Sequence, residues 1–347
     1  MHARSRQLHF GSATLSGPVL IPSVSSKGFP IDVDDNLSES SKILAFAAPD
    51  IQDALLISAY DLHHGHLQDT DRLFSSNHRE SVYGTPKLLV VDSGGYELNR
   101  QDWESGETRR GPHSPKPYGF GDYETVVDKL PRDRSLLVVS YDDPREPRRS
   151  YPEQRERAQA FFANRPHLHS DFLLKPQPDE ESINLAAVTA DIENLRAFDV
   201  IGVTEKDLGD DLLTRLKTLA QLRVLLDEHG CADRPIHVFG SLDPLWTPLY
   251  FMAGGELFDG LSWMRYAYHD GLALHPDELA VLTTQLDVKQ QRRHQLRFLA
   301  NLAALGRLRS GLIRWHAEPE NWSHLGPHAD RMHEIYDTVQ AVLGQKG

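Results

Sequence analysis

Three short apolar segments of the chain each place an aspartate at or near their carboxyl end. These aspartates are Asp92, Asp142 and Asp259. If the segments are parallel strands of one barrel, their carboxyl ends share one mouth and the three carboxylates meet there. Two carboxylates at one mouth suit glycosidic chemistry, in which one attacks or stabilises the anomeric centre and the other moves a proton.

The residues beside two of these carboxylates fit a ligand site. Asp92 is followed by a serine and by Gly94 and Gly95, and paired glycines let backbone amides approach a flat or anionic ligand closely. Asp259 is followed six residues later by Arg265. Simpler roles compete with these, because Asp92 could cap the following turn and Asp259 could form a buried salt bridge with Arg265.

A pair of acidic residues, Asp142 and Asp143, follows the third segment. Ionised aspartate only accepts hydrogen bonds, so the pair could bind the N1–H and the exocyclic amine of guanine. An Asx turn before Pro144 is the simpler interpretation. The three aspartates together favour a site, because all of them stand at the same end of an expected strand.

The other residues that could do chemistry give weaker signals. His63, His64 and His66 have no standard spacing for one metal without further ligands, so a solvated loop is the favoured interpretation. Cys231, the single cysteine, cannot form a disulfide within the chain or a cysteine-rich zinc site, and we treat it as structural. We therefore expect neither a metal nor a cofactor.

The elements that must position these residues alternate between strands and helices. Apolar runs, mostly without period-two alternation, predict strands buried on both faces at 18–24, 43–47, 54–60, 87–92, 135–141, 171–175, 199–203, 236–240 and 257–261. Helical patterns cover 151–164, 179–197, 208–230 and 244–253. This order predicts an α/β fold, a (β/α)8 TIM-type barrel over residues 1–275. A doubly wound open sheet is the alternative, although no GxGxxG motif follows an early strand.

Two regions depart from the alternation. Residues 98–120 are polar and predict a long loop at the barrel mouth. Residues 276–347 predict a C-terminal helical extension, with helices over 276–305 and about 328–343. Within it, residues 288–316 hold seven basic residues and no acidic one, which indicates either a solvated helix face or a phosphate-binding surface.

The composition and charge of the chain exclude several classes of function. The chain has 347 residues, of which 39% are hydrophobic and 25% are charged, as in an ordinary globular protein. Its formal net charge of -13 argues against a protein that coats nucleic acid by bulk electrostatics. No segment approaches the roughly 18 to 20 apolar residues of a membrane helix, and the N-terminus lacks the apolar core of a secretory signal. We therefore expect a cytoplasmic protein without a membrane partner.

Several segments taken together resemble the tRNA-guanine transglycosylases, barrel enzymes that exchange guanine for a 7-deazaguanine base without cutting the polynucleotide. VVDSGGYE at 90–97 is similar to the family's Asp-Ser-Gly-Gly-Phe-Gln signature, and GGELFDGLSWMRYAYHDG at 254–271 to the strand that carries its nucleophile. Other similar segments follow in the family's order, namely YDDP, LLKPQ, FDVIGVTE and HVFGS. The resemblance covers about residues 15–275.

The resemblance implies roles for individual residues. Asp259 would be the nucleophile that attacks the anomeric carbon, and Asp92 would be the general acid and base at the base nitrogen. Tyr96 and Phe239 would stack on the two faces of the base. The full set of base-binding residues would be Asp142, Asp143, Ser93, Gly94, Gly95, Tyr96, Gln177, Gly202, Phe239 and Gly240. Nucleic acid would contact Arg265, Lys289, Arg292, Arg293 and Arg297.

The chain also departs from the family's pattern. The family's zinc site of three cysteines and a histidine cannot form, because Cys231 stands alone and upstream of that site. Glu97 replaces the family's Gln, and residues 203–205 and 261–263 differ from its usual runs. The loss of the zinc site favours DNA slightly over tRNA as the polymer that receives the free 7-deazaguanine base.

Three other functions are alternatives. They are ordinary exchange in tRNA, a non-catalytic partner subunit of such an enzyme, and a metal-dependent barrel hydrolase that uses His63, His64, His66 and Asp259. The last is the weakest, because the histidine spacing fits no standard site. The sequence leaves open whether the chain forms a homodimer or requires a partner protein.

Overall fold

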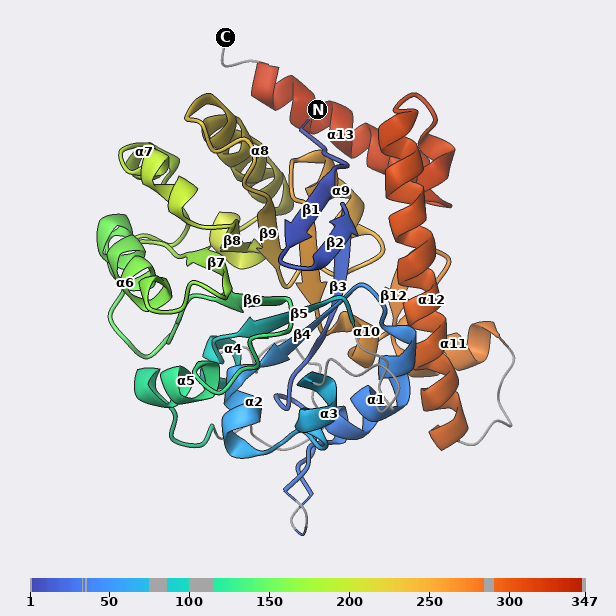
Figure 1. Cartoon of the computed structure of the whole chain (residues 1–347). Coiled ribbons are helices and arrows are strands. Elements are labelled where there is room, and N and C mark those ends of the chain that lie inside the picture. Colours follow the sequence, from blue (N-terminus) through green and yellow to red (C-terminus); the bar gives the residue numbers. More distant parts are fainter. Residues whose placement is uncertain are drawn as a thin grey trace.

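Eight parallel strands close into a barrel in the computed structural model, which describes residues 2–32, 34, 36–74, 86–99, 115–283 and 290–344 (Figure 1). The strands follow chain order around the barrel, and the last one pairs with the first. They are β3 (Val19–Val24), β4 (Ala54–Ser58), β5 (Leu88–Asp92), β6 (Leu136–Val139), β7 (His169–Leu174), β8 (Val200–Thr204), β9 (Ile236–Phe239) and β10 (Leu257–Gly260). The closed sheet confirms the predicted α/β barrel and excludes the open-sheet alternative.

Both faces of the barrel strands are buried, which explains why their sequences are continuously apolar. The barrel interior is filled by one apolar cluster that includes Ile21, Leu56 and Val90. The N-terminal hairpin of β1 (Gln7–Phe10) and β2 (Ala13–Ser16) adds Leu8 and Phe10 to this cluster. The hairpin packs at the amino ends of the strands, where Phe10 contacts His169 of β7 and Ser12 Oγ lies 3.1 Å from Ser135 Oγ just before β6.

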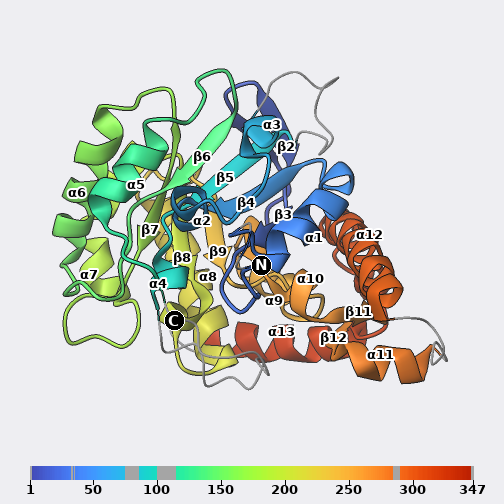
Figure 2. The ribbon, with the colours of Figure 1, turned by 90° about the horizontal axis from the view of Figure 1, so that it is seen from below.

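Helices and a short C-terminal hairpin surround the barrel. The helices of the barrel region are α1 (Glu39–Ala47), α2 (Ala59–His64), α3 (Thr70–Phe74), α4 (Gly95–Leu98), α5 (Phe120–Val127), α6 (Tyr151–Ala163), α7 (Leu185–Thr189), α8 (Leu212–Glu228), α9 (Trp246–Met252) and α10 (Ser262–Arg265). The remaining elements are β11 (Ala267–His269), β12 (Leu272–Leu274), α11 (Pro276–Leu282), α12 (Gln290–Ala317) and α13 (Ala329–Gly344). Short 3₁₀ helices cover Ala48–Asp50, Ile192–Ala197, Glu205–Leu208 and Trp322–Leu325. Figure 2 shows α6 and α7 on one side of the barrel and α12 on the other.

Three predicted elements differ from the structure. The run 43–47 is not a strand but the end of α1, whose N-cap Ser38 accepts a hydrogen bond from the Ser41 amide. A short apolar run cannot distinguish a buried strand from the buried face of a helix. The helix predicted over 179–197 is divided into α7 and a 3₁₀ helix, and the helix predicted over 276–305 is divided into α11 and α12.

Two further predictions from the sequence concern the long loop at the barrel mouth and helices that could span a membrane. Most of the loop predicted over 98–120 lies outside the described residues, which resume at residue 115. In the described part of the chain, no helix has the length and apolar character needed to cross a bilayer.

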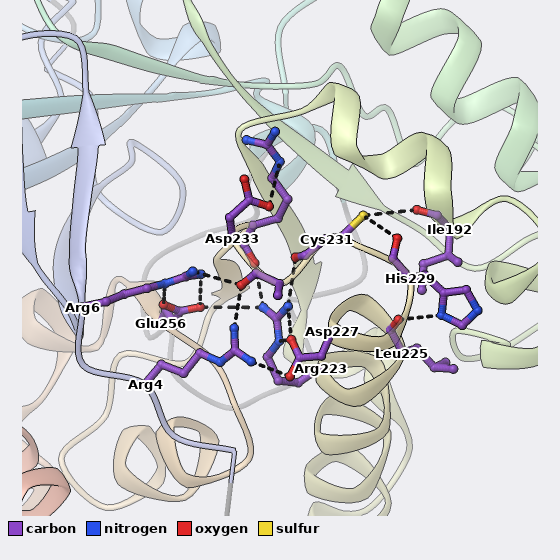
Figure 3. A network of polar contacts seen from close by, with 12 residues as sticks. Arg4, Arg6, Ile192, Arg223, Leu225, Asp227, His229, Cys231, Asp233 and Glu256 are labelled. Atoms are coloured by element: carbon purple, nitrogen blue, oxygen red, sulfur yellow. Dashed lines mark hydrogen bonds and ion pairs between the residues drawn. The ribbon is translucent and has the colours of Figure 1, made fainter.

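A network of charged side chains fastens the N-terminal segment to the closed end of the barrel (Figure 3). Arg6 donates from Nε and Nη2 to the two carboxylate oxygens of Glu256, at 2.7 and 2.8 Å. Glu256 and Arg223 of α8 are both fully buried, and Arg223 Nη2 lies 2.7 Å from Asp227 Oδ1. Arg4 also pairs with Asp227. Buried charges are tolerated only when they are paired in this way, so the network fixes α8 and the start of β10 relative to the N-terminus.

Cys231 lies at the edge of this network and is fully buried (Figure 3). Its carbonyl oxygen accepts a hydrogen bond from Arg223 Nη2 at 3.1 Å, and its thiol lies 3.6 Å from the carbonyl oxygen of Ile192. Burial raises the pKa of the Cys231 thiol. A buried thiol of raised pKa is a poor nucleophile, which agrees with a structural role.

Candidate active site

Asp259 lies in β10 at the barrel mouth, and its side chain is held from three directions. Ser23 Oγ in β3 donates to Oδ2 at 2.7 Å, and the Gly240 amide, just after β9, donates to Oδ1 at 3.1 Å. His237 Nε2 lies 3.4 Å from Oδ1, an ion-pair distance. Gly240 has a positive φ of 80°, a conformation that glycine adopts without strain. The carboxylate of Asp259 is therefore fixed in one orientation.

His237 in β9 was missed by sequence reasoning. The residue is fully buried, and its Nδ1 lies 2.7 Å from Oδ2 of Asp171, a fully buried carboxylate of β7. Burial by itself would lower the pKa of His237, but Asp171 and Asp259 raise it to about 9. An imidazolium therefore stands between two carboxylates at neutral pH. The available signal was its position two residues before Phe239, which places both side chains on one face of the strand.

Gly202 and Phe239 pack around this histidine. A Cβ atom on Gly202 in β8 would lie 2.6 Å from Asp171 Oδ1 and 2.7 Å from the Phe239 ring, so only glycine fits there. The ring centroids of His237 and Phe239 are 3.8 Å apart. Both predicted base-binding residues thus lie at the floor of the mouth and contact the Asp171–His237 pair.

Asp92 closes β5 at the same mouth. The Gly94 amide donates to its Oδ2 at 3.1 Å, so the capping role considered from the sequence is real. Burial raises the pKa of Asp92 to about 6, and the negative charges of Asp259 and Asp142 act in the same direction. Asp92 can therefore both hold and release a proton near neutral pH. Asp92 at the end of β5 and Asp259 in β10 both lie toward the carboxyl ends of barrel strands, and the Asp259 charge acts on the pKa of Asp92.

Asp142 lies beside the Asp92 turn. A Cβ atom on Gly95 would lie 2.8 Å from the Asp142 carbonyl oxygen, so the glycine allows this close approach. Burial raises the pKa of Asp142, while Lys175 at the end of β7 opposes the shift. Lys175 Nζ lies 3.7 Å from Asp142 Oδ2 and 2.8 Å from Asp207 Oδ2. Sequence reasoning missed Lys175, because it selected Gln177 from the same segment.

A cavity of about 680 Å³ opens at the carboxyl ends of β6 and β7. Asp142, Asp143 and Lys175 form part of its wall, and side chains of α6 close its outer side. A cavity of this size accepts a small ligand such as a base with part of its nucleotide. The structure therefore places the predicted base-reading carboxylates on the wall of a real cavity.

Three other predicted base-binding residues have local partners. Asp143 forms an ion pair with Arg145 at 2.6 Å; burial alone would raise the pKa of Asp143, but the hydrogen bonds from Arg145 lower it. Ser93 is buried, and its carbonyl oxygen accepts a hydrogen bond from Tyr118. Gln177 does not line the cavity: its Nε2 donates to Glu180 at 3.4 Å, and its Oε1 accepts from the amide at the start of α6.

Tyr96 and Glu97 belong to α4, which follows the Asp92 turn. The Tyr96 hydroxyl accepts a hydrogen bond from Arg265 at 2.8 Å, and Lys27 Nζ lies 4.1 Å above its ring. Glu97 accepts a hydrogen bond from Ser58 at 2.8 Å, and burial raises its pKa to about 8. Arg265 contacts Tyr96 and not Asp259, so the salt bridge considered from the sequence does not form.

Of the residues predicted to contact nucleic acid, the structure describes the side chains of Arg265 and Arg297. Lys289 lies outside the described residues, as do the side chains of Arg292 and Arg293. Arg297 is only 9% exposed and donates to the Met264 carbonyl oxygen at 3.0 Å. Arg309, later in α12, donates to the Pro18 carbonyl oxygen at the opposite end of the barrel. Arg297 and Arg309 of α12 thus contact different ends of the barrel, along which α12 runs (Figure 1).

The histidine cluster is held by protein groups. His66 Nδ1 lies 3.1 Å from Asp61 Oδ1, and its Nε2 lies 3.1 Å from Lys116 Nζ. Burial and the neighbouring His63 lower the pKa of His64 to about 4. Among the residues that the structure describes, no group of three or more His, Cys, Asp or Glu side chains is placed to bind a metal ion.

No family model matches the chain, and no curated protein matches it at a significant level. Because a barrel hosts many different reactions, its function has to be inferred from the geometry of the site.

Proposed function

We propose that the chain is a guanine transglycosylase, which replaces a guanine of a nucleic acid with a 7-deazaguanine base through a covalent bond to Asp259. The observation that supports this most is the unequal environment of two neighbouring carboxylates. Asp259 is held by hydrogen bonds from Ser23 and Gly240 and lies at an ion-pair distance from His237, whereas the pKa of Asp92 is raised to about 6. Carboxylates with such different environments divide into a nucleophile and a proton carrier.

The reaction has two half-reactions that mirror each other. An oxygen of Asp259 attacks the anomeric carbon and forms an ester, while the bond from that carbon to the base breaks. The bonding electrons go to the base nitrogen, which takes the proton of Asp92. The incoming base then gives a proton to Asp92, its nitrogen attacks the same carbon, and Asp259 leaves as a carboxylate.

The cavity at the carboxyl ends of β6 and β7 supports a base as the leaving group, although Asp92 and Asp259 are not among the residues that line it. Asp142 on its wall can accept the N1–H and the exocyclic amine of guanine, because a carboxylate offers two acceptor oxygens. Lys175, 3.7 Å away, can donate to the carbonyl oxygen of the same base. Donors and acceptors in this order match the guanine edge and not that of adenine.

The proposal favours DNA slightly over tRNA as the nucleic acid whose guanine is replaced. The support comes from the sequence, whose single cysteine cannot build the zinc site of the tRNA-acting enzymes that the chain resembles. In either polymer the target nucleotide has to leave its stack to reach a buried carboxylate. Asp259 is 6% exposed, so the base and its sugar must enter the mouth.

The test is incorporation of labelled guanine by the purified chain, with tRNA and duplex DNA offered separately. Label in one polymer identifies the substrate class, and label in neither refutes the proposal. Asp259→Asn should abolish both incorporation and the trapped covalent adduct, because an amide is a poor nucleophile. Asp53→Asn at the closed end of the barrel is the matched control and should keep activity. Full incorporation by Asp259→Asn would show that another group attacks.

A further inference from the structure

A buried line of three ionisable side chains crosses the barrel mouth from β7 to β10. Asp171 Oδ2 lies 2.7 Å from His237 Nδ1, and His237 Nε2 lies 3.4 Å from Asp259 Oδ1. Asp171 and His237 are fully buried, and Asp259 is 6% exposed. The negative charge of Asp259 also contributes to the raised pKa of Asp92 on β5.

The two contacts of this histidine differ in quality. Nδ1 forms a short hydrogen bond with Asp171, but Nε2 is buried and forms no hydrogen bond of good geometry with any group. The Oδ1 atom of Asp171 is also buried without a hydrogen-bond partner. The absence of a side chain on Gly202 leaves the space that Oδ1 occupies. The Nε2 side therefore faces Asp259 as a charge and not as a fixed hydrogen-bond donor.

We propose that His237 is a positioning residue whose positive charge is shared by Asp171 and Asp259 in the resting protein, and belongs to Asp171 alone once Asp259 has become an ester. This inference rests on the proposed function, because it assigns Asp259 as the group that is esterified. When His237 is protonated, its single positive charge stands against the two negative charges of Asp171 and Asp259, so the three side chains together carry one net negative charge. Ester formation removes that excess, so the imidazolium keeps the attacking carboxylate ionised beforehand and leaves a neutral ion pair afterwards.

The matched perturbation is Asp171→Asn, which keeps the shape of the side chain and removes the charge that holds the imidazolium. The variant should lose the His237 proton at a lower pH than the wild type. We expect the ratio of variant to wild-type rate of adduct formation to fall at least tenfold between pH 6 and pH 8. Because Asp92 titrates in both proteins, its contribution cancels in this ratio. The KM for free guanine should stay unchanged, since Asp171 does not line the base cavity.

Two further variants separate positioning from structure. Asp199→Asn is the control. It also removes a carboxylate that pairs with a histidine, but this histidine is His169, which begins β7 at the closed end of the barrel and is far along the strand from the mouth. It should give a rate ratio that does not change with pH. The double variant Asp171→Leu with His237→Phe removes both charges at once and avoids a lone buried charge, and it should form the adduct at least tenfold more slowly than the wild type at pH 7.

Nitrogen NMR of the histidine rings of the full chain tests the charge sharing by a measurement that does not depend on enzymatic activity. We expect the His237 ring to stay protonated above pH 8 in the wild type and to lose its proton below pH 8 in Asp171→Asn. A wild-type ring that titrates near 6.5, or a rate ratio that does not depend on pH, would overturn the inference. Absence of any adduct in the wild type would refute the proposed function, whereas the NMR titration would still decide whether the charge is shared.

Discussion

Replacement of Asp92 by asparagine should make the protein more stable and inactive at the same time. Burial raises the pKa of Asp92 to about 6, against 3.8 for an ordinary aspartate. A shift of about two pH units corresponds to about 3 kcal/mol at about 1.4 kcal/mol per unit. The folded state therefore carries this cost whenever Asp92 is ionised, and an uncharged asparagine of the same shape removes it. Asparagine can still accept the hydrogen bond from the Gly94 amide.

The sign of the effect depends on pH. Below pH 3.8 Asp92 is protonated in both the folded and the unfolded chain, so the substitution changes little. Between pH 3.8 and about 6 the unfolded chain ionises first, and the wild type loses stability relative to the variant. Above pH 6 the gain of Asp92→Asn reaches its full value, about 1 to 3 kcal/mol once relaxation around the carboxylate is allowed.

The assay is urea unfolding of the wild type and Asp92→Asn at pH 4 and pH 8, together with guanine incorporation at pH 7. Incorporation should fall at least 100-fold, because the proton carrier is lost. Asp143→Asn is the control of opposite sign, since hydrogen bonds from Arg145 outweigh burial and lower the pKa of Asp143. That variant should be less stable than the wild type at pH 8. If Asp92→Asn destabilises the protein at pH 8, the pKa of Asp92 is not raised in the folded protein.

Three further variants test other parts of the structure. Because burial raises the pKa of Glu97 from 4.5 to about 8, Glu97→Gln should change unfolding by urea little at pH 4, where the side chain is protonated in the folded chain and largely so in the unfolded chain, and should stabilise the protein at pH 9. Glu256→Ala removes the carboxylate partner of Arg6 and one of the two carboxylates near Arg223, which keeps Asp227, and should lower the free energy of unfolding by about 1 to 3 kcal/mol, whereas a loss below about 1 kcal/mol would show that the network contributes little. Gly202→Ala places a Cβ atom 2.6 Å from Asp171, so chemical denaturation should show a loss of about 1 to 3 kcal/mol, and wild-type stability would refute the tight packing.

Much of the fold could be predicted from the sequence because each barrel strand has a recognisable pattern of residues. A strand that is covered on both faces is continuously apolar, and eight of the nine predicted runs are strands of the barrel. The exception is the end of α1, where Ile43 and Leu44 are buried on a helix instead. The carboxylates Asp92 and Asp259 stood out because they interrupt apolar runs at the strand ends, where a polar residue has no packing reason to be.

Other parts of the site depend on contacts between residues that are distant in sequence or on which way a side chain points. His237 and Asp171 are 66 residues apart, and only closure of the barrel brings Nδ1 to 2.7 Å from Oδ2. Lys175 and Gln177 are neighbours in sequence, yet the structure places only Lys175 on the cavity wall. Arg297 has the sequence context of a surface residue, but it is buried against the segment after β10.

The sequence by itself determined the barrel and the positions of Asp92 and Asp259 at its mouth. Both follow from periodicity and from the order of residues along single strands, which are local properties. Only the tertiary structure decided the charge state of the site, namely the raised pKa values of Asp92 and His237. These shifts depend on how far water is excluded and on which charges of distant strands lie nearby, and both are set only when the barrel closes.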